Sequence, residues 1–210
     1  YGTAYMTCQT EDLEILQGKT FSRIIRWETV PFIYKAITAI TKAGPAQITA
    51  VGHGIPDQWR VAIVSAGGMR QINAKNWPLR DTDFHKATVA TANTFTLNDT
   101  NSADYTAYTS GGSVVYYTPV SLAGFTARMQ VRSTQADTTI LLSLLSSAAP
   151  PLTGIALDDT LKTITLLISA TDTAALDWTE AVYDLELVSS AGGVTQLSSG
   201  AVTVVDEVTR

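Results

Sequence analysis

Histidine is the side chain that most readily exchanges protons near neutral pH, and this chain has only two, His53 and His85. Hydrolysis through a nucleophile would need a histidine base within hydrogen-bond reach of both the nucleophile and an orienting acid. His53 lies between two glycines in a predicted turn, and no Gly-x-Ser-x-Gly motif is present to place a serine. We therefore interpret His53 as a turn residue and His85 as a surface residue, and we predict that the protein is not an enzyme.

The run Gln17-Gly18-Lys19-Thr20 ends like a phosphate-binding loop. The first glycine of that motif would fall at position 13, which is Leu13. No helix is predicted after Thr20, so the amide dipole that such a loop needs is missing. The sequence therefore predicts no nucleotide site and no cofactor.

Candidate metal ligands are few and scattered. Asp158-Asp159 is a turn signal before a strand, and calcium would require more oxygen ligands close by. The two histidines lack an evident third ligand. Cys8 is the only cysteine, so an intrachain disulfide and a thiolate zinc site are both excluded. We predict no metal site.

Asp184 and Glu186 share one face of a predicted strand and could act as paired carboxylates. The simpler hypothesis is cross-strand pairing with Arg128 and Arg132, which alternate along another predicted strand. Such exposed pairs contribute only about 0.2–1 kcal/mol each. We prefer the structural interpretation.

Composition limits the partners of the 210-residue chain. Charged residues make up only 16%, and 14 basic against 19 acidic residues give a net charge of −5. Nucleic-acid and anionic-membrane surfaces need basic clusters, so neither partner is expected. No apolar run approaches the roughly 20 residues of a membrane helix. The first 17 residues lack the basic start and apolar core of a secretory signal, so a protein that is not exported is expected.

Strand patterns run through the whole chain, and no long helix is predicted, so the fold class is all-β. Ala127, Met129 and Val131 alternate with polar residues, as expected of a half-buried strand. Ser169 and Asp172 fit the capping box of one helical turn. The predicted strands cover residues 19–27, 46–51, 61–64, 87–90, 94–97, 113–117, 125–132, 162–169, 183–187 and 200–205.

The order of these strands predicts one domain nested in another. The opening strand has no partner nearby, and matching strands resume only after Pro119. Short strands with their own turns and glycines, at the spacing of a small barrel, fill the interval. We predict an N-terminal arm at 1–17, a discontinuous β-sandwich at 18–36 and 117–210, and an inserted small β-barrel at 37–116.

The sandwich segments resemble a known class of domain. Residues 120–132, 164–176 and 182–187, with 18–27 as the opening strand, resemble the immunoglobulin-like sandwiches of tailed-phage baseplate and tail proteins, including the N-terminal domain of baseplate upper proteins. This resemblance covers a little over half of the chain.

The insert is similar to a small β module that phage tail proteins share with the first catalytic-cysteine half-domain of ubiquitin-activating enzymes. The similarity is carried by residues 52–55, 68–73, 93–97 and 105–112. Ubiquitin activation does not transfer, because the insert has no cysteine. Residues 56–59 depart from the usual turn, and the loop at 77–86 is longer than expected.

Together the two resemblances imply a non-enzymatic structural protein of a tailed-bacteriophage virion. Its place would be the tail, baseplate or a fibre-attachment adaptor, reached after synthesis in the bacterial host cytoplasm. The implied partners are copies of itself in a symmetric assembly and other phage structural proteins. A capsid decoration or collar protein is one alternative, and a receptor- or glycan-binding tail module is another.

Protein contacts are predicted at three places. The run Thr139–Leu145 is apolar on both strand faces, so it is either covered twice or leaves one face for a partner. The arm and the long loop are the other two. The interface candidates are Ile140, Leu142, Leu144, Glu11, Leu13, Trp77 and Phe84.

A cluster of tyrosines in the insert is the one feature that favours a glycan. Aromatic rings stack on sugars, but they more often pack a small barrel or anchor a protein interface. We prefer core or interface. The residues are Tyr105, Tyr108, Tyr116 and Tyr117.

Overall fold

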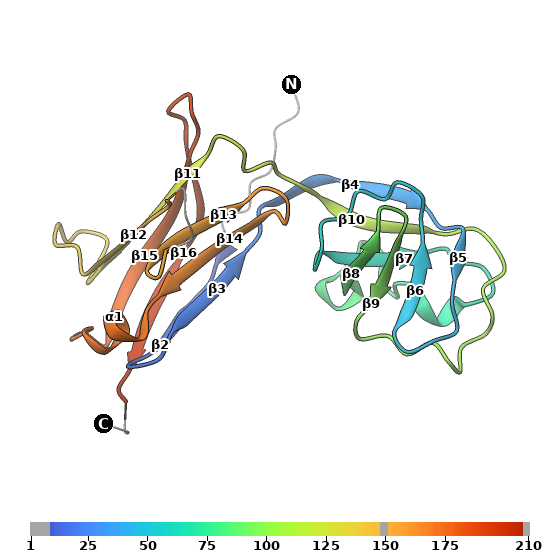
Figure 1. The fold of residues 1–210 in the computed structure, drawn as a ribbon, viewed down its shortest axis with the longest axis horizontal. Coiled ribbons are helices and arrows are strands. Elements are labelled where there is room, and N and C mark those ends of the chain that lie inside the picture. The colour runs from blue at the N-terminus through green and yellow to red at the C-terminus, as the bar shows by residue number, and fades with distance from the viewer. Residues whose placement is uncertain (1–8, 148–150, 208–210) are drawn as a thin grey trace. The chain divides into compact units, whose positions relative to one another are not determined.

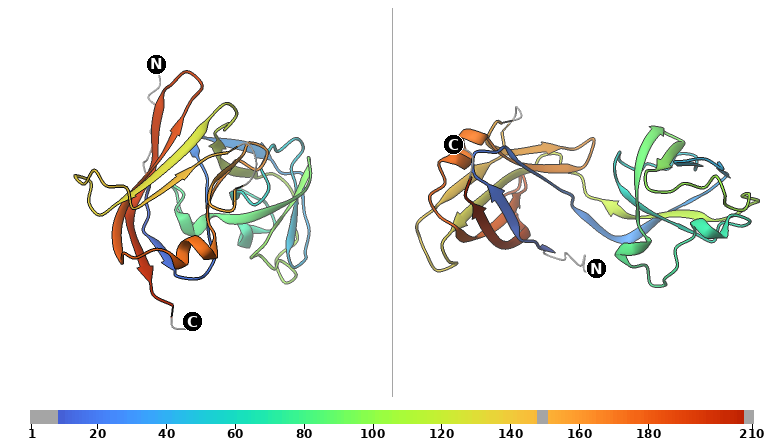
Figure 2. Two further views of the ribbon diagram at one scale, coloured as in Figure 1. Left: turned by 60° about the vertical axis from the view of Figure 1, so that its left-hand side comes forward. Right: turned by 90° about the horizontal axis from the view of Figure 1, so that it is seen from below.

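The computed structural model describes residues 9–147 and 151–207 and is almost entirely β, as the sequence predicts (Figures 1 and 2). The chain divides into two compact units. The sandwich unit contains the described residues up to Trp27 together with those from Val120 onward. The insert unit is Glu28–Pro119. Each unit encloses its own cluster of buried apolar side chains.

Two sheets form the sandwich unit. The larger sheet has the order β1-β16-β15-β11-β12, with β2 also on β16, and the smaller has the order β13-β14-β3. The larger sheet is made of β1 (Gln9–Thr10), β2 (Leu13–Leu16), β11 (Thr126–Arg132), β12 (Leu142–Leu145), β15 (Glu180–Val188) and β16 (Val194–Val205). The smaller is made of β3 (Phe21–Ile25), β13 (Gly154–Asp158) and β14 (Thr163–Ile168).

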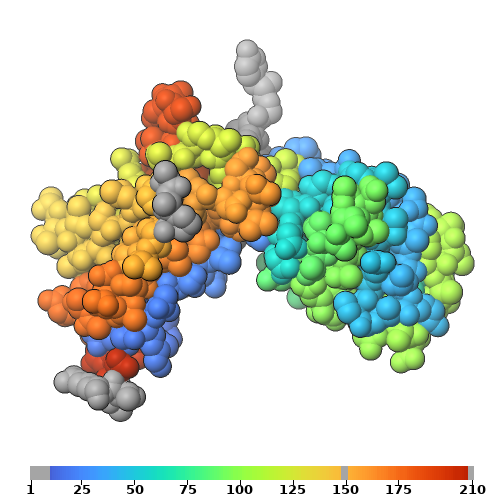
Figure 3. Space-filling model, in the orientation of Figure 1, coloured from blue at the N-terminus to red at the C-terminus, as the bar shows by residue number. Residues whose placement is uncertain are grey.

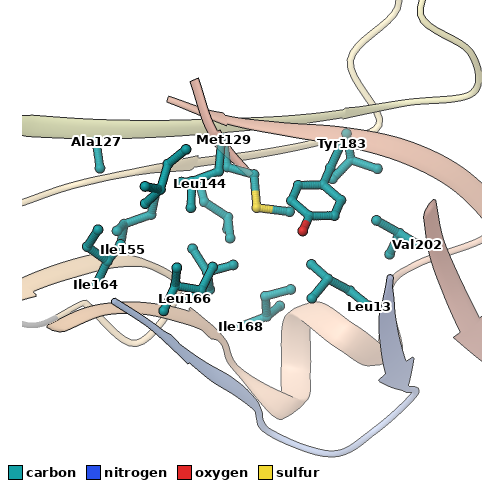
Figure 4. Close-up of a cluster of buried hydrophobic side chains, with 14 of the residues drawn as sticks. Leu13, Ala127, Met129, Leu144, Ile155, Ile164, Leu166, Ile168, Tyr183 and Val202 are labelled. Carbon is teal, nitrogen blue, oxygen red and sulfur yellow. The ribbon is translucent and has the colours of Figure 1, made fainter. Parts of the chain in front are cut away.

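The alternating patterns of the sequence set the core of this unit. Met129 of β11 and Tyr183 of β15 point from the larger sheet toward Leu166 of β14 in the smaller (Figure 4). All three side chains are buried, at 2% exposure or less. The predicted inward faces of β11, β14 and β15 are confirmed, because the two-residue period of a strand decides which side chains leave water.

The predicted helical turn is also confirmed. Helix α1 (Ala170–Ala174) connects β14 in the smaller sheet to β15 in the larger. The Ser169 hydroxyl accepts a hydrogen bond from the Asp172 amide at 3.1 Å and caps the first turn. The crossing between sheets is therefore fixed by a local sequence signal.

The N-terminal segment differs from the prediction of an arm. β1 and β2 lie parallel to β16, with Gln9 opposite Ser198 and Leu13 opposite Val202. The described part of 1–17 therefore belongs to the larger sheet. Its strand pattern is only two and four residues long, and its partner lies near the other end of the chain, so no local signal indicates the pairing.

The insert unit holds a seven-stranded sheet in the order β4-β10-β7-β8-β9-β6-β5. β4 and β5 are separated by only Ile37 and Thr38, so the two ends of the sheet belong to one bent segment. β4 and β5 stand at the two ends of this order, and no ladder between them is seen in the described residues. A closed barrel therefore stays a prediction. The strands are β4 (Glu28–Ala36), β5 (Ala39–Ile40), β6 (Ala46–Thr49), β7 (Arg60–Val64), β8 (His85–Thr91), β9 (Thr94–Leu97) and β10 (Ser113–Pro119), with 3₁₀ turns at Arg70–Ile72 and Asp81–Asp83.

The boundary between the two units falls at different residues from those predicted from the sequence. β4 pairs along β10, so residues 28–36 belong to the insert unit rather than to the sandwich. The sandwich is still discontinuous, because β3 pairs with β14, with Ile25 opposite Ile164. The Val120 amide donates to the Trp27 carbonyl at 3.1 Å, so the chain leaves and re-enters the sandwich unit at neighbouring points.

One carboxylate ties two loops of the sandwich unit. Asp159 accepts hydrogen bonds from the Lys162 ammonium at 2.6 Å, the Leu122 amide at 2.6 Å and the Ser121 hydroxyl at 3.0 Å. These donors, Lys162 first, lower the pKa of Asp159 from 3.8 to about 2. The charged carboxylate is therefore the form that holds the two loops together.

We expect Asp159→Asn to lower the unfolding midpoint at neutral pH. Because the folded pKa lies below the unfolded value, the wild-type advantage is complete above about pH 4 and disappears as the pH falls through about 2. Thermal melts of both proteins across this pH window measure it. Asp206→Asn, at an exposed carboxylate, is the control. If the difference in unfolding midpoint between wild type and Asp159→Asn stays constant down to pH 2, the charged Asp159 carboxylate is not the form that holds the two loops.

Candidate functional site

Strand β12 places the apolar run of the sequence at an edge of the larger sheet. Leu144 is 1% exposed and belongs to the core, and Leu142 is half-buried against it. Ile140 and Leu145 are 45% and 62% exposed. The prediction is therefore wrong for Leu144 as a contact residue, because alternation turns it inward, and the uncovered side chains are Ile140 and Leu145.

Leu145 has a charged neighbour on the outer face of the larger sheet. It lies opposite Arg128 of β11, and Arg128 lies opposite Glu186 of β15. The Arg128 Nε donates to Glu186 Oε2 at 2.7 Å. Beyond β12, the described residues show only one bridge, from Ser146 to Ile155. The outer rim of β12 thus presents apolar side chains beside a charged sheet face, and Figure 3 shows this yellow segment at the surface.

The cross-strand pairing predicted for the four charged residues is correct for one pair. Arg128 pairs with Glu186, as expected. Arg132 instead donates to the Asp137 carbonyl at 2.7 Å and to the Gln130 side chain at 2.8 Å. Asp184 accepts from the Gln196 amide at 2.7 Å. The two carboxylates therefore have different hydrogen-bond partners.

Glu11 and Leu13, predicted as contact residues of an arm, serve the fold itself. Leu13 is 4% exposed and lies in the sandwich core. Glu11 forms an ion pair with Arg23 of β3, and its carbonyl accepts from the Tyr183 hydroxyl at 2.8 Å. Both predictions are corrected, because the pairing of β1 and β2 with β16 turns these residues toward the sandwich.

The long loop of the insert unit is organised by one buried carboxylate. Asp83 Oδ1 accepts from the Lys75 amide at 2.9 Å, and Oδ2 accepts from the Arg80 amide at 2.9 Å. These backbone donors lower the pKa of Asp83 below its usual value. Trp77 at the loop tip is 72% exposed. The structure therefore keeps Trp77 available to a partner.

Phe84, at the end of the same loop, is engaged within the unit. Its ring stacks on Tyr117 at 5.5 Å and on Phe32 at 6.3 Å between centroids. The Arg60 guanidinium lies 5.0 Å from the Phe84 ring centre, a cation–π distance. Phe84 is half-buried. It anchors the loop to β10 and β4 and is not a free contact residue.

The two histidines have different surroundings. His53 is 1% exposed; its Nδ1 accepts from the Ile55 amide at 3.0 Å, so it is structural. His85 lies in the wall of a hollow, with its Nδ1 2.9 Å from Asp99 Oδ1. The pair of His85 and Asp99 could not be predicted from the sequence, because 14 residues and a hairpin separate the two side chains and no motif marks them.

The tyrosines of the insert do not form one sugar-binding face. Tyr116 is in the core, where burial raises its pKa to about 12 and its hydroxyl donates to the His53 carbonyl. The Tyr108 hydroxyl donates to the Ile37 carbonyl at 3.0 Å. Tyr105 packs against the core, and Tyr117 stacks with Phe84. Packing is their main role.

Over residues 9–147 and 151–207, no three His, Cys, Asp or Glu side chains gather as metal ligands would. Gly18-Lys19-Thr20 leads into strand β3, and the Lys19 amide donates to Leu16 in a turn. None of the helices in the described ranges is long and apolar enough to cross a membrane. No protein-family model matches the chain, and no curated protein matches it.

Proposed function

We propose that this protein is a non-enzymatic structural component of a tailed-bacteriophage virion, in the tail, baseplate or a fibre-attachment adaptor. It would act by holding copies of itself in a symmetric assembly and by contacting other structural proteins. The proposal draws on the resemblances of the two sequence segments. It also draws on an all-β fold in which one compact unit is inserted into another.

The observation that carries the proposal is the exposure of two apolar side chains at β12 and just before it, at the end of the larger sheet. A sheet edge offers unpaired backbone groups, which most monomers blunt with charge, proline or a covering element. Here Leu145 and Ile140 expose 62% and 45% of their surface at that edge. Exposed apolar side chains at the end of a sheet fit contact with another copy, and repeated heterologous contacts form a ring where the rotation between copies closes.

Charge on the neighbouring strands would give such a contact its register. Arg128 lies between Leu145 on β12 and Glu186 on β15 across the outer face. Apolar side chains at the centre of an interface with charged groups at its rim are the usual arrangement. Leu145 would supply the buried centre, and Arg128 and Glu186 the rim.

We expect Leu145→Asp to weaken self-association of the full chain by tenfold or more. Removing a buried leucine contact of about 1.5–3 kcal/mol accounts for that change. Sedimentation velocity over a concentration series measures it. The matched control is Leu161→Asp, at a leucine that is 41% exposed in the turn between β13 and β14.

Two outcomes would argue against this contact. One is a chain that stays monomeric at every concentration, with or without the substitution. The other is equal weakening by Leu161→Asp, which would indicate a general effect of charge. A capsid decoration or collar protein remains the alternative position, and the same association is expected there, so solution measurements do not separate the two.

A further inference from the structure

A hollow of about 310 Å³ lies wholly within the insert unit. Its walls come from three stretches of chain, 71–76, 82–85 and 99–105, which only the fold brings together. Small-molecule sites have volumes of about 300–1,000 Å³, so this hollow suits one small ligand. No role in the assembly proposed above involves it.

The walls are held in place by side chains that act as internal braces. Asp83 fixes the first two stretches through the Lys75 and Arg80 amides. Ser102 is fully buried and braces the third: its hydroxyl donates to the Thr41 carbonyl at 2.7 Å and accepts from the Ala43 amide at 3.1 Å. A site whose walls are fixed before binding loses little entropy when a ligand enters.

The polar groups that face the hollow include both donors and acceptors. His85 Nδ1 contacts Asp99 Oδ1 at 2.9 Å, which leaves Nε2 for a ligand. The Thr100 hydroxyl donates to the same Asp99 oxygen at 3.1 Å, leaving Oδ2 as an acceptor. Thr82 and Tyr105 add hydroxyl groups, which can donate or accept.

The charges at the site disfavour anions. The lining holds one cation, Lys75, against two carboxylates, Asp83 and Asp99, and Asp83 already accepts backbone hydrogen bonds. A phosphate or carboxylate ligand would need an excess of cationic donors, which the lining lacks. The ligand class that suits mixed donors and acceptors beside an aromatic ring, with no excess of cations, is an uncharged polyhydroxylated one.

We propose that this hollow binds a neutral saccharide unit. Sugar hydroxyls donate to Asp99 Oδ2 and to His85 Nε2 and accept from Thr82, and the Tyr105 ring supplies an apolar wall. The larger hollow, about 750 Å³ on the outer face of the larger sheet, suits this role less. Its charged side chains already have hydrogen-bond partners: Arg128 donates to Glu186, and Asp184 accepts from Gln196.

The test is ligand-observed NMR and calorimetry on the full chain with free hexoses, N-acetylhexosamines and uronic acids. We expect binding of at least one neutral sugar, weakened about tenfold by Thr82→Val, which removes a ligand hydrogen bond, and by Asp99→Asn, which replaces a charged acceptor with a weaker neutral one. Asp104→Asn is the matched control, because Asp104 is an exposed acid of the same unit outside the lining. Thermal melts verify that each variant folds.

Three results would overturn the site. They are no binding of any neutral sugar at millimolar concentration, tighter binding of uronic acids than of neutral sugars, and equal weakening by Asp104→Asn. Sedimentation of the same samples reports self-association separately. Failure of the sugar site therefore leaves the structural role standing, and failure of assembly leaves the sugar site standing.

Discussion

Trp59→Ala is expected to unfold the insert unit at a much lower temperature while the sandwich unit melts as before. Trp59 is fully buried in the insert core, and its indole NH donates to the Tyr117 carbonyl at 3.2 Å. Truncating a buried tryptophan costs about 3–5 kcal/mol, a large part of the roughly 5–15 kcal/mol that stabilises a domain. Scanning calorimetry should show two transitions, of which only one shifts.

The reciprocal variant is Leu166→Ala in the sandwich unit. Leu166 is fully buried between the two sheets, and its truncation should cost about 2–5 kcal/mol. It should move the other transition and leave that of the insert unit in place. If both variants shift one common transition by similar amounts, the two units do not fold independently and the expectation is wrong.

Gly200→Ala is expected to displace the N-terminal strands from the sandwich. A Cβ atom at Gly200 would lie 2.2 Å from the Glu11 carbonyl oxygen, a backbone atom that cannot move alone. Segment 9–16 would have to shift, exposing Leu13 and Ile15, which are 4% and 0% exposed. Overpacking of this kind costs about 1–3 kcal/mol, and lost burial adds about 1.5–3 kcal/mol for each side chain exposed.

Hydrogen exchange at the amides of Leu13 and Ile15, together with the free energy of unfolding, measures the Gly200 effect. Gly193→Ala is the control in the same β15–β16 hairpin, because its nearest neighbour is the flexible Ser189 hydroxyl at 3.2 Å. It should leave exchange at Leu13 and Ile15 unchanged. Wild-type protection of these amides in Gly200→Ala would mean that the parallel pairing with β16 does not depend on this glycine.

Period-two patterns made much of the fold predictable. The inward faces of β11, β14 and β15 could be assigned from alternation alone, and Ser169 indicated the single helical turn. The strand β4 was harder, because Pro31 interrupts its pattern. The structure accommodates Pro31 by a register shift. Tyr117 lies opposite Phe32, but Thr118 lies opposite Thr29, so Val30 and Pro31 have no opposite residue in the ladder. Such a bulge supplies the hydrogen-bond gap that proline requires.

The boundary between the units and the role of the first strands could not be predicted for one physical reason. Both depend on pairings between distant segments: β4 with β10, and β2 with β16. A sequence pattern reveals that a strand exists and which face it buries, but it does not name the partner strand. The sequence therefore indicates a free acid at Glu11. In the structure its side chain pairs with Arg23 and its carbonyl accepts from the Tyr183 hydroxyl.

The candidate contacts show the same limit. Alternation could have separated Leu144 from Leu145, because neighbours in a strand face opposite sides. The exposure of Trp77 depends on the backbone hydrogen bonds of Asp83 in the same loop, and the anchoring of Phe84 depends on Arg60, which is distant in the chain. The hollow beside His85 is built from three segments and has no sequence signature.

The most direct test of the structural role is cryo-electron microscopy, with protein composition, of purified phage particles from cultures that produce this chain. We predict that the chain is a stoichiometric component and that its two-unit density repeats with the symmetry of the tail. Repeating density in the capsid shell would contradict the tail position. Absence of the chain from intact particles would contradict the proposed function itself.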